Sequence, residues 1–316
     1  MLVSQVVAPK TSEVVEVEDP IAAAHEVLVD VIACGVCTSD LTPWRNGPGE
    51  RDPIRLGHEI VGRVRSVGSP GLGWNPGDLV TGLGGGGFAT VAAMEAASIL
   101  PLPAGIAPEL AIGEPIADLE EALARTGPKA GDRIAVVGLG FMGLGLIQLA
   151  KTRAPGILVG VDPSEAARAR AIRLGADVAF HPDELPEEYR SDVGPERESR
   201  MDIVLEATGV TSGLTTASLL VRPFGTLCVV GYHHAGTAMF DMGLWYKAAT
   251  IVNGFCPARP RLVSAMQDAL ELIASHRISY APLITHRFGL AEVDEAYRLM
   301  ESRSPDFVKS ALMISA

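Results

Sequence analysis

The feature that most constrains the fold is a glycine-rich turn between two apolar stretches. Gly138, Gly140 and Gly143 have the spacing G-x-G-x-x-G, the apolar stretch 134–137 precedes them, and an apolar helical stretch follows. Asp162 closes the next apolar stretch, 19 residues after Gly143. A strand, this turn, a helix and an acidic residue about 20 positions further on are typical of a dinucleotide-binding βαβ unit.

Each position of this pattern has a physical role. The first glycine permits the turn, the second lets the backbone approach a pyrophosphate, and the third lets the helix pack on the strand. The helix N-terminus then faces the phosphates. Asp162 can accept hydrogen bonds from a ribose diol and its charge repels a 2′-phosphate, so the sequence predicts NAD rather than NADP. Two alternatives are FAD in the same fold and a glycine-rich turn with a solvated Asp162.

Two further segments are expected at the same edge of the sheet. EATG (206–209) and GYHH (231–234) each follow a predicted strand, and ligands of such sheets bind at the carboxyl ends of the strands. His233 and His234 could ligate a metal, but adjacent side chains diverge, so we expect one of them to line the nicotinamide pocket. The predicted cofactor contacts here are Gly138, Gly140, Phe141, Met142, Gly143, Asp162, Thr208, Gly209 and Tyr232.

The two parts of the chain differ in their periodicity. The first third has short alternating strands separated by Gly/Pro-rich turns, which predicts a small barrel or sandwich. From about residue 117 strands and helices alternate, with helices at 117–126 and 163–175, which predicts a doubly wound parallel sheet. The polar, proline-broken stretch 181–200 is predicted to be a surface loop. The fold class is therefore α/β with an added β-rich domain.

Composition and charge narrow the classes of partner. The chain has 316 residues, enough for two domains. Its formal net charge is -12, and an acidic surface repels phosphate backbones, so we expect no nucleic acid partner. The longest apolar stretch, 134–150, is short for a membrane span and is interrupted by glycines. Four cysteines are few for a disulfide scaffold and no signal-peptide pattern is present, so we expect the cytoplasm.

The stretch ACGVCTSD (33–40) holds two of the four cysteines, Cys34 and Cys37. It could be a redox pair, half of a zinc knuckle, or one metal ligand with an unrelated neighbour. A redox pair needs both thiols in one exposed site at a helix start. A knuckle needs a second short-spaced pair, whereas Cys228 and Cys256 stand alone. The third interpretation remains, with Cys37 as the ligand and Cys34 as a small buried residue.

Cys37 has candidate partners for a metal. His58 and Glu59 follow it by 21 and 22 residues, and a thiolate and an imidazole are good zinc ligands. A catalytic zinc has three protein ligands and one open position, and Glu114, just before the change of pattern, is the best candidate for the third. Each residue alone is more often an ordinary core or surface residue. Their combination with a nucleotide-binding half favours a metal site.

Six motifs together resemble one family, the zinc-dependent medium-chain alcohol dehydrogenases. They are CGVCTSD, GHEIVGRVRSVG, GD at 77–78, EP at 114–115, GLGFMG and PLITHRF at 282–288. The resemblance covers essentially the whole chain. It implies a GroES-like catalytic domain formed by 1–115 and 257–316, with a Rossmann NAD-binding domain at 116–256 between them.

The resemblance also implies roles for individual residues. Cys37, His58 and Glu114 would be the zinc ligands, with Glu59 as an alternative ligand during exchange of water or substrate. Ser39 would take the hydroxyl proton. Asp40 would orient His58, as metal-bound imidazoles generally require. Lys309 matches the basic residue of the tail that reaches the cofactor phosphates.

The chain departs from the family in two places. Members with a second, structural zinc carry a four-cysteine lobe after the GD, whereas the segment 77–94 of this chain has no cysteine. The sequence therefore predicts one catalytic zinc per chain and no structural zinc. Thr42 stands where many members have a histidine that completes a proton relay. Threonine can pass a proton but cannot store one near neutral pH, so the relay would end in water or the ribose.

These observations predict an NAD-dependent, zinc-catalysed oxidoreductase that acts on a secondary alcohol or polyol, or on the corresponding ketone or aldehyde. One alternative is a zinc-less reductase of the same fold that acts on an activated double bond. Another is a non-catalytic NAD-binding sensor. The ligand set of Cys37, His58 and Glu114 speaks against the first alternative, and only the change at Thr42 favours the second.

Substrate pocket and assembly are the last sequence expectations. Trp44, Phe88 and Tyr232 are candidates to line a pocket for a small-molecule substrate, although aromatic residues are more often in the core. The last strand of the parallel sheet, at about 250–254, would leave an open edge. Pairing of this edge across a two-fold axis would cover it, so we expect a homodimer and no membrane partner.

Overall fold

The computed structural model describes residues 1–190, 199–233 and 236–314. The chain divides into two compact units. Unit 1 is Met1–Ala117 with Arg259–Ala316, and unit 2 is Asp118–Ala258. Across the described ranges, no helix has the length and apolar character needed to cross a membrane.

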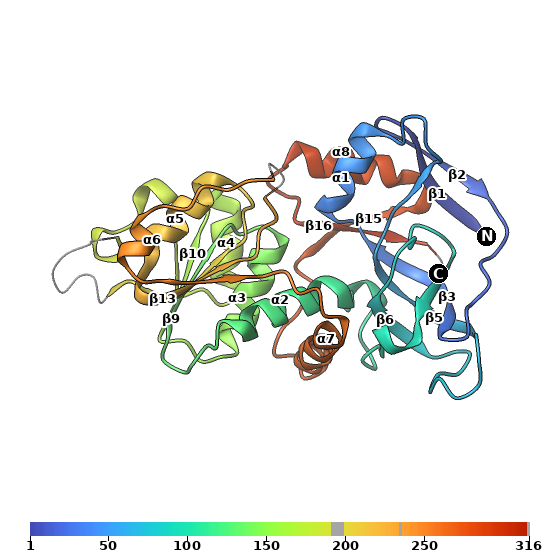
Figure 1. Cartoon of the computed structure of the whole chain (residues 1–316), viewed down its shortest axis with the longest axis horizontal. Coiled ribbons are helices and arrows are strands. Elements are labelled where there is room, and N and C mark those ends of the chain that lie inside the picture. The colour runs from blue at the N-terminus through green and yellow to red at the C-terminus, as the bar shows by residue number, and fades with distance from the viewer. Residues whose placement is uncertain (191–198, 234–235, 315–316) are drawn as a thin grey trace. The chain divides into compact units, whose positions relative to one another are not determined.

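Unit 2 is built on a six-stranded sheet in which every neighbouring pair is parallel (Figure 1). The strand order is β11-β10-β9-β12-β13-β14. Its strands are β9 (Arg133–Val137), β10 (Ile157–Val161), β11 (Val178–Phe180), β12 (Met201–Glu206), β13 (Val221–Val229) and β14 (Thr250–Asn253). The order reverses between β9 and β12, and ligands of such sheets bind outside the carboxyl ends at this point.

Helices follow the strands of unit 2 in turn. They are α3 (Phe141–Lys151), α4 (Glu165–Arg173), α5 (Thr211–Leu220) and α6 (Gly243–Tyr246). Helices α3 and α4 contact each other and β10, while α5 contacts α6, β12 and β13. Val137 and Val159 of the sheet are buried in one cluster with Leu214 of α5. The predicted doubly wound parallel sheet is confirmed.

The stretch after β11 differs from the expectation. It was predicted to be a surface loop, but its described part makes two short 3-10 turns, Pro182–Glu184 and Glu187–Tyr189. Leu185 and Tyr189 are buried in the sheet core, so two apolar side chains anchor a segment that is otherwise polar. Residues 191–198 lie outside the described residues.

Unit 1 is rich in β-strands, which confirms the second part of the predicted fold class. One sheet has the order β2-β1-β4, and a larger one has the order β15-β16-β3-β5-β6-β8, with β7 paired to β3. The strands are β1 (Leu2–Ala8), β2 (Thr11–Glu16), β3 (Glu26–Gly35), β4 (Ile54–Arg55), β5 (Glu59–Val67), β6 (Leu79–Leu83), β7 (Val91–Glu95), β8 (Ile99–Pro101), β15 (Ile284–Gly289) and β16 (Lys309–Met313).

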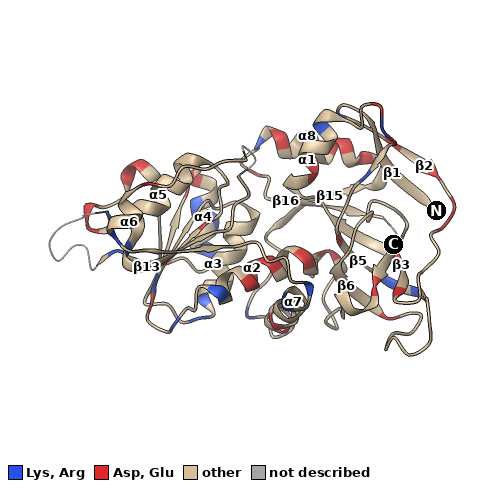
Figure 2. Cartoon of the chain, viewed as in Figure 1, with Lys and Arg blue, Asp and Glu red and all other residues tan. Residues whose placement is uncertain are grey.

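Helices border these sheets. They are α1 (Leu41–Asn46), α2 (Gly113–Arg125, which contains the boundary between the units), α7 (Arg259–Ala274) and α8 (Val293–Ser302). Trp44 of α1, Phe88 and Tyr297 of α8 pack together in the core of unit 1. Two of the aromatic residues expected at a pocket are therefore core residues. Figure 2 shows acidic and basic positions interspersed over the elements of both units.

Candidate functional site

The candidate metal site lies where β3 ends and β5 begins. These strands pair antiparallel, with Gly35 opposite Glu59. Cys37 comes two residues after β3, and His58 directly precedes β5, so the ladder brings segments 21 residues apart side by side. One ligand atom each from Cys37, His58 and Glu59 lies within 4.8 Å of the others.

Asp40 holds the imidazole of His58 from the side away from this group. Its Oδ1 lies 3.5 Å from Nδ1 of His58, and its Oδ2 accepts a hydrogen bond of 3.3 Å from the backbone N–H of Cys37. The Asp40 side chain is almost fully buried, which keeps this contact away from water. Contact through Nδ1 leaves Nε2 as the nitrogen that can bind a metal, as the predicted role of Asp40 requires.

Glu114 lies on the Nε2 side of His58. It sits in the first turn of α2, and its Oε1 is 3.9 Å from Nε2 of His58. The group of mutually close ligand atoms nevertheless contains Glu59 rather than Glu114. Two carboxylates therefore lie near the metal-binding group: Glu59 belongs to it, and Glu114 is 3.9 Å from Nε2 of His58.

Glu59 is a buried carboxylate with only one satisfied oxygen. Its Oε1 accepts a hydrogen bond of 2.8 Å from Nζ of Lys309, which also donates to the carbonyl of Val36. Its Oε2 is buried without a hydrogen-bond partner among the described residues. A Cβ atom on Gly35 would stand 1.7 Å from Oε2, so any larger residue at position 35 would displace the carboxylate from its present position. The structure thus places Lys309, predicted at the cofactor phosphates, against Glu59.

The electrostatics of the group favour a cation. Burial opposes a charge on His58, but hydrogen bonds to Asp40 and Cys37 and the charge of Glu114 outweigh burial and raise its pKa to about 12. Burial likewise opposes a charge on Lys309, and the carboxylate of Glu59 more than compensates and raises its pKa. Thiolate, imidazole and carboxylate are the ligand types of catalytic zinc sites. The donor set and the bare oxygen of Glu59 therefore fit zinc.

The remaining residues of the 33–42 stretch have distinct environments. Cys34 is fully buried in β3, as predicted, and burial raises the pKa of its thiol well above the usual range. Ser39 lies in the 3-10 turn Thr38–Asp40, and Thr42 lies in α1; both are exposed. The two hydroxyls are therefore accessible to water, while the neighbouring Asp40 is not.

Gly57, the residue before His58, has a backbone conformation and a tight packing that only glycine adopts without strain. Gly57 has a φ of +88°, and a Cβ atom there would stand 2.5 Å from the Phe88 ring. Gly87 donates a hydrogen bond of 2.8 Å to the carbonyl of Gly57, and Phe88 donates to Leu56. The glycine-rich segment after β6 therefore braces the residue that precedes His58.

The candidate cofactor turn has the geometry that its glycine spacing predicts. Gly138 has a φ of +91°, and a Cβ atom on Gly143 would stand 1.8 Å from the carbonyl oxygen of Gly138. The space around Gly140 is open, with no atom within 4 Å of a Cβ placed there. Gly140 is the N-cap of α3, and Phe141 and Met142 form its first turn. A pyrophosphate fits this turn because the open side faces the helix N-terminus.

Asp162 stands beside this turn at the end of β10. Its Oδ2 accepts a hydrogen bond of 2.8 Å from Leu139 N–H, and its Oδ1 accepts one of 2.7 Å from Ser164 N–H. A carboxylate oxygen can accept two hydrogen bonds, so each oxygen keeps capacity for a ribose hydroxyl. The two amides fix the direction in which the carboxylate points.

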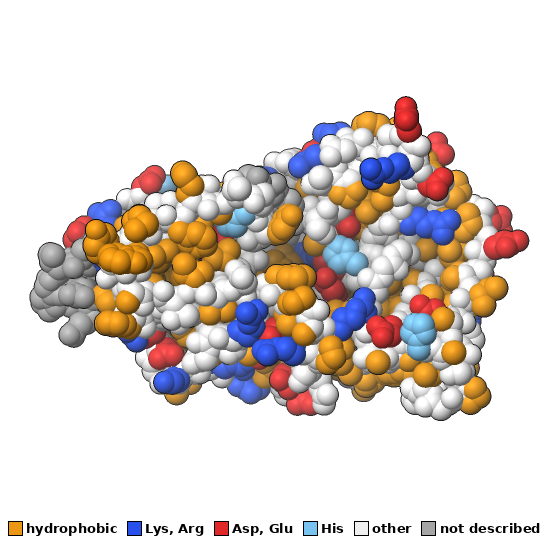
Figure 3. Space-filling view, in the orientation of Figure 1, with side chains coloured by type: hydrophobic (Ala, Val, Ile, Leu, Met, Phe, Trp, Pro, Cys, Tyr) orange, Lys and Arg blue, Asp and Glu red, His pale blue; other side chains and the backbone are white. Residues whose placement is uncertain are grey.

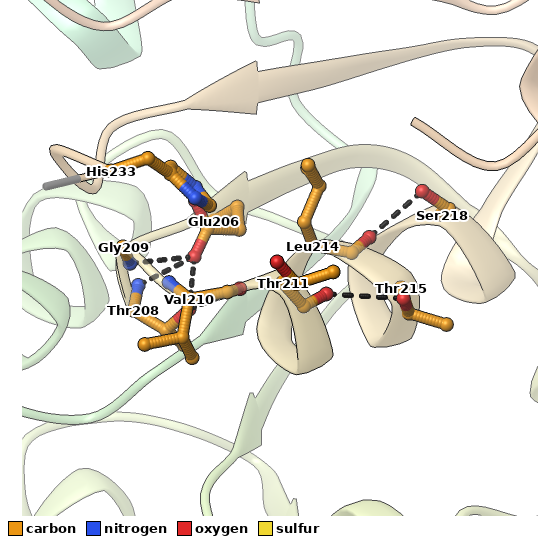
Figure 4. A network of polar contacts seen from close by, with 9 residues as sticks. All are labelled: Glu206, Thr208, Gly209, Val210, Thr211, Leu214, Thr215, Ser218 and His233. Atoms are coloured by element: carbon orange, nitrogen blue, oxygen red, sulfur yellow. Dashed lines mark hydrogen bonds and ion pairs between the residues drawn. The ribbon is translucent and has the colours of Figure 1, made fainter. Parts of the chain in front are cut away.

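Figure 4 shows a second buried carboxylate, Glu206, at the end of β12. Its Oε1 accepts hydrogen bonds from Thr208 N–H, Thr208 Oγ1 and Gly209 N–H, and Nε2 of His233 lies 3.2 Å from Oε2. The predicted contacts Thr208 and Gly209 thus share one anchor. Tyr232 is largely exposed, and His234 lies outside the described residues.

Two residues of these sites were not identified as such from the sequence. Glu206 ends the strand within EATG, and an acidic residue after the three apolar residues 203–205 is a signal for a strand end with special partners. The family resemblance implies that Lys309 contacts the cofactor phosphates, and nothing in the sequence links it to Glu59, 250 residues away. Neither ion pair follows from local sequence spacing.

Comparisons with known proteins point in one direction. Residues 23–104 match the family model of the alcohol dehydrogenase GroES-like domain, and residues 142–275 match that of zinc-binding dehydrogenases. A sorbitol dehydrogenase of Halalkalibacterium halodurans is 26% identical, with 91% of this chain and 92% of the relative covered. An NADP-dependent isopropanol dehydrogenase of Clostridium beijerinckii is 24% identical, with 95% and 96% covered.

A solved structure agrees with these sequence matches. Alcohol dehydrogenase TADH from Thermus sp. ATN1 superposes with a TM-score of 0.86 at 25% sequence identity. The superposition covers 100% of this chain and 100% of that chain. The likeness therefore extends over both units and not over the cofactor fold alone.

Proposed function

Because the chain belongs to the zinc-type medium-chain alcohol and polyol dehydrogenase family, we propose that it transfers hydride between NAD(H) and a secondary alcohol or polyol. In the reverse direction it reduces the corresponding ketone or aldehyde. The observation that carries the proposal is the group of Cys37, His58 and Glu59 with its unsatisfied carboxylate oxygen. The protein is accordingly an oxidoreductase that acts on CH–OH groups.

The metal-binding residues have separable tasks. Cys37 and His58 would hold the zinc, and a bound zinc would supply the Lewis-acid chemistry that acidifies a hydroxyl group and polarises a carbonyl group. Asp40 fixes the Nδ1 side of His58 at 3.5 Å and thereby presents Nε2 to the metal. A positioned general base contributes only about 3–5 kcal/mol, so the residues that would hold the zinc matter more to the reaction than the proton acceptor.

Glu114 and Glu59 share the third ligand position in our proposal. Glu114 is half-buried and near Nε2 of His58, which supports it as the resting ligand. Glu59 belongs to the close group but is held by Lys309, which supports it as the ligand that takes over during exchange. Loss of zinc from Glu114→Gln with retention in Glu59→Gln is the expected result, and the opposite pattern would reverse the assignment.

Ser39 is the proposed acceptor of the hydroxyl proton. Its exposed side chain in the turn after Cys37 can pass the proton to water, as can the exposed Thr42. Neither hydroxyl stores a proton near neutral pH, so the proton leaves to solvent or to the ribose. Ser39→Ala should lower kcat about 10²–10⁴-fold.

We propose NAD as the preferred cofactor, on the basis of Asp162. Its two backbone hydrogen bonds hold the carboxylate beside the glycine-rich turn, where its charge would repel a 2′-phosphate. The NADP-dependent relative shows that the family also uses the phosphorylated cofactor, so the preference needs a direct test. Titrations of the protein with NADH and NADPH should give tighter binding of NADH, and Asp162→Ala should remove the difference.

We further propose one zinc per chain and no structural zinc. The segment between β6 and β7, where a four-cysteine lobe would stand, contains glycines and no cysteine. This segment instead braces Gly57, so it already has a structural role. Elemental analysis of the purified protein should give one zinc per chain, and a value of two would contradict this.

A homodimer through the edge of the unit 2 sheet is our proposal for the assembly. Strand β14 pairs with β13 and, among the described residues, with no strand on its other side. Exposed apolar side chains surround this edge, and Figure 3 shows hydrophobic side chains gathered over the end of unit 2 that carries α6. They include Met242, Trp245, Tyr246, Ile251 and Phe255, which are 65%, 71%, 81%, 44% and 72% exposed.

An exposed apolar area of this kind is typical of an interface rather than of a free surface. Light scattering of the purified chain should give twice the chain mass, and Trp245→Glu with Tyr246→Glu should shift it to one chain mass. A monomeric wild-type protein at micromolar concentration would contradict the proposal. The matched control is Ile21→Glu, which changes an exposed apolar residue of unit 1.

The state of the cysteines supports a reducing compartment. Cys34, Cys37, Cys228 and Cys256 are all free thiols in the described part of the chain. Disulfides persist in oxidising compartments and are rare in the cytosol. A cytoplasmic location is the proposal that fits this, and cell fractionation with a compartment marker tests it.

One panel of assays tests the function as a whole. Purified protein is mixed with secondary alcohols and polyols in the presence of NAD, and NADH absorbance is followed. We expect turnover with some of these substrates, and loss of turnover in Cys37→Ala and His58→Ala. Metal-free protein with full turnover would refute the zinc mechanism, and absence of turnover with every alcohol and carbonyl would favour the NAD-binding sensor.

A further inference from the structure

The carboxylate of Glu206 is fully buried, and its side chain receives four hydrogen-bond donors. Three of them belong to Thr208 and Gly209, on the turn after β12, at distances of 2.7 Å and 3.1 Å for the two backbone amides. The fourth is His233, on the turn after β13. The backbone carbonyl of Glu206 also accepts from Val230 and Gly231. One residue therefore ties two turns to each other.

These turns have almost no freedom to shift against each other. A Cβ atom on Gly231 would stand 2.3 Å from the backbone nitrogen of Gly209, and one on Gly209 would stand 2.5 Å from the carbonyl oxygen of Tyr232. The turn after β12 also touches the glycine-rich turn, because a Cβ atom on Gly138 would stand 2.7 Å from Thr208 Cγ2. The three turns are thus packed backbone against backbone at the carboxyl ends of β9, β12 and β13.

The chemistry of the pair sets the state of His233. An ionised carboxylate can only accept hydrogen bonds, so Nε2 of His233, 3.2 Å from Oε2, must carry the hydrogen. Hydrogen bonds to an ionised group are about twice as strong as neutral ones. The His233 side chain is 12% exposed, so water competes little for this contact. His233 is the side chain through which the turn after β13 reaches Glu206.

We propose that Glu206 and His233 form a positioning pair that fixes the turns after β12 and β13 as a preformed cradle for the nicotinamide cofactor. His233 acts through Glu206 and the two turns rather than on the reacting atoms. This inference rests on the proposed use of a nicotinamide cofactor by unit 2. It assigns His233 to cofactor placement and not to a metal, the other role that the sequence allowed.

Removal of the pair should loosen the cradle and weaken cofactor binding without touching the metal chemistry. In His233→Ala we expect the Kd and the KM for NADH to rise about tenfold, since an ordered side-chain contact contributes on the order of this factor through preorganisation. The kcat, the KM for the alcohol and the zinc content should stay within about twofold of wild type. His233→Gln keeps an N–H donor and should recover most of the lost affinity.

Three further variants make the test specific. Glu206→Gln loses the charge that gathers all four donors, and we expect a larger rise in Kd than for His233→Ala. The double variant should bind NADH no more than about twofold worse than Glu206→Gln alone, because residues in one network are not additive. His25→Ala, an exposed histidine of unit 1, is the matched control and should leave every constant unchanged. Fluorescence titration with NADH and steady-state kinetics give the constants.

The outcomes separate this inference from the proposed function. If wild type binds NADH and His233→Ala binds it equally well, the positioning pair is refuted and the proposed function stands. If wild type binds neither NADH nor NADPH, both are refuted. Should Glu206→Gln fail to fold, the His233 variants decide, and a Kd in His233→Gln as high as in His233→Ala would also overturn the proposal.

Discussion

Unit 1 and unit 2 each contain one buried glutamate beside a candidate site, and the two carboxylates are treated differently. Glu59 has a single ionic partner, Lys309, and one oxygen without any hydrogen bond in the described structure. Glu206 receives two backbone amides, a hydroxyl and an imidazole. Both side chains are essentially inaccessible to water, at 1% and 0% exposure.

The difference indicates what each carboxylate is for. An unsatisfied buried acceptor costs about 1–3 kcal/mol and more when charged, so such a group persists where another partner compensates for it. A zinc ion beside Glu59 would supply that compensation. Both oxygens of Glu206 already have hydrogen-bond partners within the protein, so this carboxylate stabilises the backbone of the two turns. One is arranged to exchange partners, and the other is arranged to keep them.

The largest expected effect is the loss of turnover when the zinc site beside Glu59 is removed. In Cys37→Ala the zinc content should fall to near zero, and turnover should fall at least about a thousandfold, because the Lewis acid contributes several kcal/mol. The Kd for NADH should stay within about twofold, since Glu206 and its turns are untouched. Elemental analysis and NADH titration measure the two effects. Equal loss of both would show that the sites are not separable.

Lys309→Met removes the positive partner of Glu59 and so tests whether the two buried glutamates differ in their dependence on a cation. It removes the lysine that donates a hydrogen bond to the buried Glu59, so the free energy of unfolding of the metal-free protein should fall by about 3–5 kcal/mol. Zinc should restore part of this loss, because the freed carboxylate can then bind the cation. Urea unfolding with and without zinc gives the values. The control is Lys151→Met, which removes an exposed pair with Asp177 and should change the free energy by less than about 1 kcal/mol.

Asp40→Asn tests the contribution of the Asp40 charge to zinc binding by His58. The amide keeps the shape of the side chain but loses the charge that faces Nδ1 of His58. Zinc affinity should fall about 10–100-fold, as is usual for the hydrogen-bond partner of a metal-bound histidine. Competition with a chelator of known affinity measures this. A variant that retains wild-type zinc affinity would show that Asp40 has only a structural part.

The last effect, the smallest when it is counted per pH unit, is the dependence of zinc binding on pH. The neighbouring negative groups raise the pKa of His58 to about 12 in the metal-free protein, so zinc must displace a proton from it across the neutral range. Zinc affinity should therefore rise about tenfold per pH unit between pH 7 and pH 9. In the metal-free protein the same group stabilises the fold fully below its unfolded pKa of about 6.5, and this contribution disappears as pH rises through the folded value.

Chelator competition at several pH values measures this slope. Binding of NADH is the internal control, because its Kd should not change with pH in the way that zinc affinity does. A zinc affinity that is flat between pH 7 and pH 9 would show that His58 is already neutral in the metal-free protein.

The sequence predicts the locally encoded parts of both sites. The turn of Gly138, Gly140 and Gly143 could be derived from the local sequence, because the glycine spacing, the apolar stretches on both sides and Asp162 all lie within 30 residues of one another. Cys37, His58 and Asp40 came from short motifs whose meaning rests on the resemblance, and the β3–β5 ladder then brings them together. The two glutamate partners could not be derived, because the Lys309 and His233 contacts depend on strand order and packing.

Other predictions were wrong because the sequence did not show which side chains are buried. Trp44 and Phe88 were candidates for a pocket, but both belong to the core of unit 1, where an aromatic ring contributes most. The polar stretch after β11 was predicted as a loop, yet Leu185 and Tyr189 anchor it. The average composition of the stretch 181–200 is polar, so it does not reveal single buried apolar residues such as Leu185 and Tyr189.

Gly35 has a consequence for anyone who alters this chain by random mutagenesis. On a strand, a small residue usually tolerates alanine, and a library would treat the position as open. Here the added methyl group would stand 1.7 Å from the oxygen of a residue on the neighbouring strand, so even the smallest replacement displaces the carboxylate. Selection for a new substrate should therefore leave position 35 unchanged while the surface around it drifts, because the side chain of Glu59 already fills the space that a larger residue would need.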